Sequence, residues 1–517
     1  MTLAYDERLT SNGMHKRMIQ AFMRSARACA GAAGSHPGPL PRAGRRAAQL
    51  AMAALLAGCA SMAPPHQRPP LPVPDAWGQA APEEGVAAAA VGWNDYFVDP
   101  QLRALIGQAL QSNRDLRLAA LRIEEARAAY RIQRAGLYPT VGVSADGSRA
   151  RVPGDLNLSG RTAIASQYQV GLGASAWELD FWGRVASLRD AALETFLASE
   201  AAHRAVALGL ITQVAQTYLA IRELDERIAL AGQTLGSRSE SLRIFRRRVE
   251  VGATSRLDLI QVEVLWEQAR TLVAQLEQER AAQGHALELL LGAQPQLAPA
   301  ATRPGDTDVL KELSPGLPSD LLENRPDIIA AEHQLKAASA NIGAARAAFF
   351  PRVALTGALG TASASLGGLF ESGSLAWSFA PSLSLPIFDG GARRASLDLA
   401  EVRREQSVAQ YEKTIQSAFR DVLDALAARR WLAEQVSVLT HMQAAQTERA
   451  RLAKLRYDNG AAAFLEVLDA QREQLTVEQQ LVQARRALLA AGVSLYAALG
   501  GGTKAPEGGA PAVSSHP

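Results

Sequence analysis

Large apolar and small residues alternate along Leu375-Ala376-Trp377-Ser378-Phe379-Ala380-Pro381-Ser382-Leu383-Ser384-Leu385. Side chains on a strand point alternately to its two faces, so this segment predicts a strand with one apolar face and one small, polar face. Residues 167–175 alternate in the same way. Both segments have roughly the 10-residue length of strands that cross a membrane in a β-barrel. The alternation alone equally fits an antiparallel sheet with one solvated face.

The chain contains two copies of one unit. A set of residues recurs 212 positions later in the same order, including Asp115, Arg134, Ala135 and Pro139, which recur as Asp327, Arg346, Ala347 and Pro351. In each copy the periodicity changes from helical to alternating directly after Tyr138-Pro139 or Phe350-Pro351. Each copy therefore predicts two strands.

Four strands cannot close a barrel, and an open edge in hydrocarbon would leave backbone groups unpaired. A chain that crosses the membrane in this way must therefore form an oligomer. Two copies would give about 8 strands and three about 12, and both are allowed barrels. The sequence alone does not choose between them.

A very long helix follows each strand pair, over roughly Val185–Val249 and Arg394–Tyr457. At about 1.5 Å per residue each helix extends close to 100 Å. Apolar residues fall at seven-residue spacing in the first helix, as in a left-handed coiled-coil seam: Val214, Ile221, Ile228, Leu235, Leu242 and Val249. Gly252 and Gly460 mark turns, after which Leu257 to about Leu291 and Phe464 to about Leu499 should return antiparallel.

The N-terminal region has the pattern of a bacterial lipoprotein signal. Arg45-Arg46 precede the apolar run Ala47–Gly58, which is too short to span a bilayer as a helix. The run ends Leu56-Ala57-Gly58-Cys59, which resembles a lipobox, so Cys59 is predicted to become the lipidated N-terminal residue. The Pro-rich stretch from Pro64 to Pro74 suits a flexible tether.

Composition excludes several classes of function. The formal net charge is +3 with acids and bases mixed, which provides no electrostatic footprint for nucleic acid. Both cysteines lie in the first 60 residues and the eight histidines are scattered, so no metal site is expected. No nucleophile elbow, phosphate loop or dinucleotide turn is present. We therefore expect neither an enzyme nor a bound cofactor.

Several strings resemble the TolC-like outer-membrane factors, and within them the lipoprotein branch that serves resistance-nodulation-division pumps. The similarity runs from Trp93 to Leu499, and its most specific strings are Trp177-Glu178-Leu179-Asp180-Phe181-Trp182-Gly183-Arg184, Arg325-Pro326-Asp327, Ile342-Gly343-Ala344-Ala345-Arg346-Ala347-Ala348-Phe349-Phe350-Pro351, Pro386-Ile387-Phe388-Asp389-Gly390-Gly391 and Tyr496-Ala497-Ala498-Leu499-Gly500-Gly501-Gly502.

The resemblance implies a mainly α-helical trimer with a 12-stranded outer-membrane β-barrel, four strands per chain, above a periplasmic barrel of coiled-coil hairpins. It implies a passive duct of a tripartite efflux pump, with a periplasmic adaptor and an inner-membrane resistance-nodulation-division transporter as partners. The protein would lie in the outer membrane, anchored by covalent diacylglycerol and acyl lipid on Cys59. A duct for heavy metals or another export system, or a structural periplasmic coiled-coil lipoprotein, remains the alternative.

The resemblance also implies site residues in the hairpin turns. Leu465 and Asp469 would narrow the resting periplasmic mouth, Glu466 would add to the acidic ring, and Arg472 stands beside them. The first copy has Asp258 and Gln261 at related positions, which argues against equal rings from both copies. Adaptor docking is predicted at the two hairpin tips, through Arg248, Gly252, Arg456 and Gly460.

The predicted organisation follows from these features. A signal-peptide region covers residues 1–58 and the lipid anchor with its Pro-rich tether covers 59–92. The first efflux repeat spans 93–293, an equatorial linker spans 294–318, and the second repeat spans 319–499. A disordered tail is expected at 500–517.

Overall fold

The computed structural model describes residues 62–77, 86–157, 160–297, 313–314, 316 and 318–503. The chain divides into two units, Met1–Ala60 and Ser61–Pro517, and every described residue belongs to the second. Cys59, the signal-peptide region and most of the linker at 294–318 lie outside the described residues. Within the described residues, no helix has both the length and the apolar composition needed to span a bilayer.

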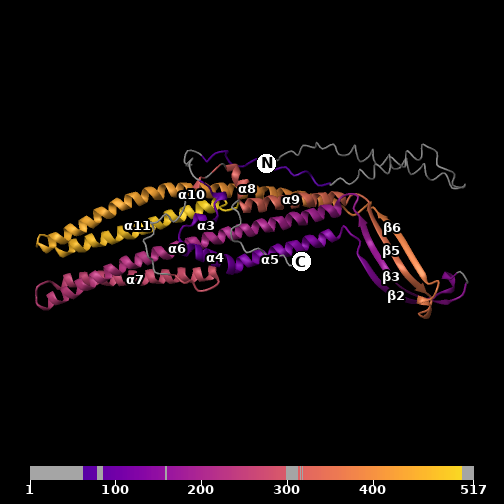
Figure 1. Ribbon diagram of the computed structural model, residues 1–517, viewed down its shortest axis with the longest axis horizontal. Helices are drawn as coiled ribbons and strands as arrows, with labels where there is room; N and C mark the ends of the chain where they lie inside the picture. The colour runs from indigo at the N-terminus through magenta and orange to yellow at the C-terminus, as the bar shows by residue number, and fades with distance from the viewer. Residues whose placement is uncertain are drawn as a thin grey trace. The chain divides into compact units, whose positions relative to one another are not determined.

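The two copies fold into the same series of elements (Figure 1). The first copy consists of α5 (Arg114–Ala135), β2 (Val141–Val152), β3 (Ala163–Leu179), α6 (Arg184–Glu250) and α7 (Arg256–Leu291). The second consists of α9 (Pro326–Ala347), β5 (Arg352–Ser363), β6 (Leu375–Ser384), α10 (Ala392–Asp458) and α11 (Phe464–Ala498). Both α6 and α10 have 67 residues, and α7 and α11 have 36 and 35, so the two hairpins have matching lengths.

Short elements surround the middle of the long helices. They are β1 (Val86–Ala87), η1 (Ala88–Ala90), α3 (Trp93–Tyr96), α4 (Pro100–Ser112), β4 (Leu313–Ser314), η3 (Pro318–Asp320) and α8 (Leu321–Asn324). β1 pairs in parallel with β4, which joins the segment before the first copy to the segment between the copies. The strand connections carry η2 (Gly154–Leu156) and η4 (Gly367–Phe370).

The four long strands form one antiparallel sheet in the order β2-β3-β5-β6. The register aligns the predicted apolar faces, because Leu359 lies between Leu172 and Trp377. A bulge between Ala174 and Trp177 inserts one extra residue in β3, and Trp177, Glu178 and Leu179 remain paired with β5 beyond it. Trp377 is 75% exposed in the single chain, as expected for a face that contacts lipid.

Glycines and prolines at the element boundaries have defined local roles. Gly390 and Gly391 adopt positive φ between β6 and α10, and Asp389 accepts hydrogen bonds from the backbone N–H groups of Gly391 and Arg393 at 3.1 and 3.2 Å. Pro326 is the first residue of α9, where a missing N–H costs no hydrogen bond.

The long helices pack in the order α7, α6, α11, α10. The main core gathers where α6, α10 and α11 meet the short elements, around buried residues such as Ile221, Tyr411 and Tyr496. Below it, Ile228 of the heptad row packs in one cluster with Leu276 of α7, so the returning helix is the partner of the seam over that stretch. Nearer the turns, Leu468 of α11 joins the seam.

The Pro-rich segment is packed, and its description as a flexible tether was wrong for residues 62–77. Arg68 donates two hydrogen bonds to the buried Glu332 of α9, at 3.2 and 3.0 Å. Trp77 stacks on Phe419 of α10 at 4.9 Å and donates to the carbonyl of Gly316. Proline lacks a donor for a regular ladder, but the side chains between the prolines supply the contacts.

The start of the predicted disordered tail is also part of the fold. The N–H of Gly501 donates to the Tyr496 carbonyl at 2.9 Å, and that of Gly502 donates to the Ala88 carbonyl at 3.0 Å. A Cβ at position 501 would lie only 2.3 Å from the Tyr496 ring, so the chain can wrap this ring only with glycine there. Residues 504–517 lie outside the described residues.

Candidate gate and docking surface at the hairpin turns

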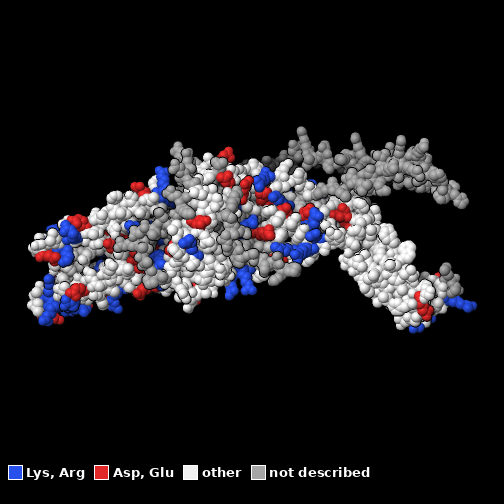
Figure 2. All heavy atoms as spheres, viewed as in Figure 1, with Lys and Arg blue, Asp and Glu red and all other residues white. Residues whose placement is uncertain are grey.

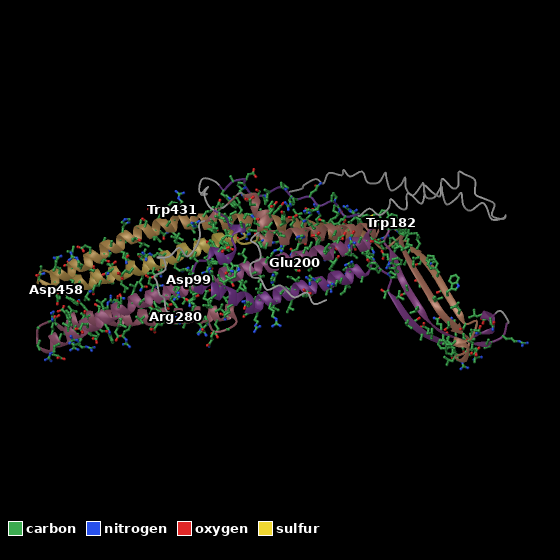
Figure 3. All side chains as sticks on the ribbon, viewed as in Figure 1. Asp99, Trp182, Glu200, Arg280, Trp431 and Asp458 are labelled. Carbon is green, nitrogen blue, oxygen red and sulfur yellow. The ribbon has the colours of Figure 1, made fainter. Side chains whose placement is uncertain are left out.

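The turn between α10 and α11 brings the predicted gate residues together. α10 ends at Asp458, labelled at the turn in Figure 3, and Gly460 follows with φ +71°. The N–H groups of Gly460 and Ala461 donate to the carbonyls of Tyr457 and Arg456 at 2.9 and 2.8 Å. These bonds cap the helix and reverse the chain, as a positive-φ glycine allows.

The gate carboxylates are paired with arginines in the single chain. Asp469 accepts from Arg449 of α10 at 2.8 Å and from Arg472 at 2.7 Å. Glu466 accepts from Arg456 at 2.5 Å. All of these side chains are 40–56% exposed, so solvent screens the pairs and each contributes little to stability.

Leu465 is the apolar member of the predicted gate. It lies in the first turn of α11 and is 56% exposed in the single chain. Phe464, beside it, points instead toward the first hairpin. Its ring lies 4.8 Å from that of Phe245 in α6 and 4.9 Å from that of Tyr457 in its own hairpin. Successive helix positions point about 100° apart, so a packed Phe464 leaves Leu465 exposed.

The first hairpin turn is capped differently. Gly252 has φ +73°, and Ser255 and Asp258 form a reciprocal capping box at the start of α7, with hydrogen bonds of 3.1 and 3.2 Å. The Ser255 and Thr254 hydroxyls lower the pKa of the Asp258 carboxyl. Asp258 therefore serves the helix start, which supports the expectation that the two copies do not provide equal gate rings.

Arg248 joins the two hairpins near their turns. It donates to the Tyr457 hydroxyl at 2.5 Å, and its guanidinium carbon lies 5.5 Å from the Phe245 ring centre. Arg456, its counterpart in the second copy, instead bonds within its own hairpin, to Glu466 and the Ala461 carbonyl. The two predicted docking arginines therefore have different surroundings.

Two residues of this region were not indicated by the sequence pattern. Arg449 pairs with Asp469 across the hairpin, and the antiparallel return after Gly460 was the signal that could have found it. Arg238 of α6 is only 5% exposed, donates to the Leu265 carbonyl at 2.7 Å, and has a buried Nε without a partner in the described chain. Burial, and then Arg472, lower the pKa of Arg238. No periodicity marks such a buried cation.

The family profile described as "Outer membrane efflux protein" matches residues 105–293 and 317–501, which is most of the chain. The chain belongs to the outer membrane efflux protein family. Each matched segment covers one copy of the repeat, so the family's unit is the duplicated unit of this sequence.

Relatives in this family extend the similarity over nearly their whole length. The outer membrane protein OprJ of Pseudomonas aeruginosa is 46% identical over 451 residues, which is 87% of this chain and 94% of OprJ. The solvent efflux pump outer membrane protein SrpC of Pseudomonas putida is 46% identical over 454 residues, 87% of this chain and 96% of SrpC.

Solved structures of bacterial membrane proteins share the fold. A membrane protein from Pseudomonas aeruginosa superimposes with a TM-score of 0.81 at 45% identity, covering 86% of this chain and 98% of its own. The MtrE outer membrane channel of Neisseria gonorrhoeae, solved in its open state, gives 0.78 at 40% identity, covering 86% and 99%. The fold is that of the trimeric TolC-like channels, and the protein is an outer-membrane efflux channel whose helices extend into the periplasm.

Proposed function

We propose that three copies of the chain form the outer-membrane duct of a tripartite efflux pump and conduct small molecules passively to the exterior. The observation that carries this proposal is the open sheet β2-β3-β5-β6, whose apolar face is continuous and whose two outer strands lack a neighbour within the described chain. Pairing β2 of one copy with β6 of the next satisfies both edges in the membrane.

The proposed partners are a periplasmic adaptor and an inner-membrane resistance-nodulation-division transporter, and the transporter selects the cargo. The duct performs no chemical reaction. In the described residues, no group of three or more histidine, cysteine, aspartate or glutamate side chains could hold a metal ion.

We further propose that Leu465, Glu466, Asp469 and Arg472 form the resting constriction. Rings of side chains at a narrow point control conduction in channels. The pairing of Asp469 with both Arg449 and Arg472 supports this, because the arginines hold the carboxylate in one position on two neighbouring helices.

The adaptor is proposed to dock on the hairpin tips, through Arg248, Gly252, Arg456 and Gly460. A Cβ built on Gly252 or Gly460 meets nothing within 4 Å, so another backbone can approach both turns closely. Cys59 is proposed to carry the lipid that fixes the N-terminus to the membrane.

Complementation tests the proposed function. A strain lacking this chain should accumulate a fluorescent pump substrate, and the wild-type chain should restore export only when adaptor and transporter are also present. Restored export in a strain without either partner, or SDS-resistant oligomers with the mass of two chains, would overturn the proposal of a trimeric pump component.

A further inference from the structure

The apolar face of the sheet ends in a charged border, at the end of the strands where β2 connects to β3. One face contains Val353, Leu355, Leu359 and Thr361 of β5, in register with apolar residues of β3 and β6. This is the face that lipid must cover, because its side chains are large and apolar while the opposite face is small and polar. Figure 2 shows the sheet almost wholly uncharged, with blue and red atoms returning at its end.

The register gives the height of this apolar face. From Val353 to Ser363 the strand rises about 3.4 Å per residue, and at a tilt of about 40° this covers roughly 25 Å, the height of the apolar band in outer-membrane barrels. Tyr168 pairs with Ser363 and with Gly147, at the level where an aromatic girdle ends such a band.

Two arginines continue the same face above that level. On β2, Val141, Val143, Ala145 and Gly147 alternate outward, and Arg149 and Arg151 follow with the same parity. They pair with Ser166 and Ile164, which continue the outward row of β3. Arg149 and Arg151 therefore lie about 5 and 10 Å above the band, at the depth of lipid headgroups.

No ion pair joins these arginines to an acid of the described residues. Both are exposed, and neither has a hydrogen-bond or salt-bridge partner among the described residues. Asp146 on the same strand has the opposite parity and accepts from Gln169 at 3.3 Å. Asp155 lies beyond the strand, in η2. Two unpaired guanidinium groups thus border an apolar surface.

We propose that Arg149 and Arg151 form a binding site for the phosphate groups of the glycolipid in the outer leaflet, whose acyl chains pack on the apolar band below. Guanidinium groups bind phosphate through paired hydrogen bonds, and long arginine side chains reach from an apolar surface to a polar layer. The apolar rows and the two cations match the two parts of such a lipid. The site is a property of the barrel surface and is independent of conduction.

Native mass spectrometry of the full-length trimer tests the proposal. Trimers are reconstituted in vesicles of phosphatidylethanolamine with lipid A bearing two phosphates, or with dephosphorylated lipid A, and the lipid A retained per trimer is counted. The wild-type trimer should retain the phosphorylated form about tenfold more, given two charge-assisted contacts. Equal retention of the phosphorylated and dephosphorylated forms by the wild-type trimer overturns the proposal.

A second experiment compares the lipid A retained by the double variant Arg149→Gln/Arg151→Gln with that retained by Arg122→Gln/Arg131→Gln. The second pair removes the same charge from exposed positions on α5. Only the first should lose the preference for phosphorylated lipid A, while both form SDS-resistant trimers. If the first pair does not assemble, the single variants Arg149→Gln and Arg151→Gln are used. A preference that survives in the strand variants, or that both pairs lose equally, contradicts the assignment. The retained lipid A is counted without measuring export activity.

Discussion

Glu332 is the residue that fixes the N-terminal segment to α9. Its carboxylate is 7% exposed and contacts Arg68, His66 and Lys336 at 3.0–3.3 Å. Burial tends to raise the pKa of Glu332, but Arg68 and Lys336 outweigh it, and the pKa lies below its usual range. The stabilising effect is therefore present above the ordinary glutamate pKa and is lost as the pH falls through the lowered value.

Replacing Glu332 tests that role. Glu332→Gln should lower the free energy of unfolding by about 1–3 kcal/mol at neutral pH, because a buried charge-assisted contact is lost. The difference from the wild type should shrink in acid, where the wild-type carboxylate is protonated. Thermal unfolding at neutral and acidic pH measures both effects. The control Glu405→Gln changes an exposed pair with Arg404 and should shift stability by less than about 0.5 kcal/mol. Equal effects of the two substitutions on the free energy of unfolding would contradict this role of Glu332.

Lipid attachment at Cys59 is a second prediction about a single residue. Cys59→Ser should abolish lipid attachment while trimers still form, because the strands can hold the protein in the membrane without the lipid. Intact-mass spectrometry of the mature protein decides the point. A wild-type mass that shows an unmodified Cys59, or retention of the preceding residues, is incompatible with lipidation at this site.

Contacts between residues were predictable from the sequence only where the two residues are close along the chain. The roles of Asp389 and Pro326 involve only neighbouring residues, which the local sequence is enough to indicate. The contact of Arg68 with Glu332 joins residues 264 positions apart, and no periodicity encodes it. Composition was misleading there, because prolines indicate the absence of regular structure and not the absence of packing.

Elements were the most predictable level of the structure. The helices expected at Val185–Val249 and Arg394–Tyr457 extend to Arg184–Glu250 and Ala392–Asp458. Their length and heptad spacing over many turns leave few alternatives. The apolar and polar faces of the strands followed from the alternation, but the bulge near Trp177 did not, since one extra residue leaves the alternation on either side intact.

The two glycine turns support a prediction at the scale of the hairpin. Gly460→Asn should leave SDS-resistant trimers in the outer membrane, because asparagine tolerates positive φ better than other residues with a side chain. The added side chain should nevertheless abolish export by blocking approach of the adaptor. Trimer gels, substrate accumulation and adaptor crosslinking measure these outcomes.

Gly373→Asn is the matched control for this change. Gly373 also has positive φ and open space around it, but it lies in the connection between β5 and β6 at the other end of the chain's strands. It should leave export unchanged. Normal export and adaptor crosslinking by the Gly460 variant would rule out docking at this turn.

The chain contains two copies of one structural unit, and the copies differ most clearly at their hairpin turns. Both copies supply two strands and one long hairpin, so the channel wall is built from equivalent parts. The turns differ, since Asp258 caps a helix while Asp469 is held by two arginines. The duplication was visible in the sequence, whereas the assembly into a trimer came from the resemblance, because four strands per chain fit more than one barrel.

We propose that this chain forms a duct whose resting constriction lies at the second hairpin turn. Single-channel conductance of the purified trimer in planar bilayers tests the position of this constriction. Leu465→Ala/Asp469→Ala should raise conductance and weaken cation preference, because the ring loses both its bulk and its charge. The matched pair Leu257→Ala/Glu263→Gln, on the first hairpin, should conduct like the wild type. Unchanged conductance and cation preference in the Leu465/Asp469 variant, with trimers intact, would mean that the constriction lies elsewhere in the channel.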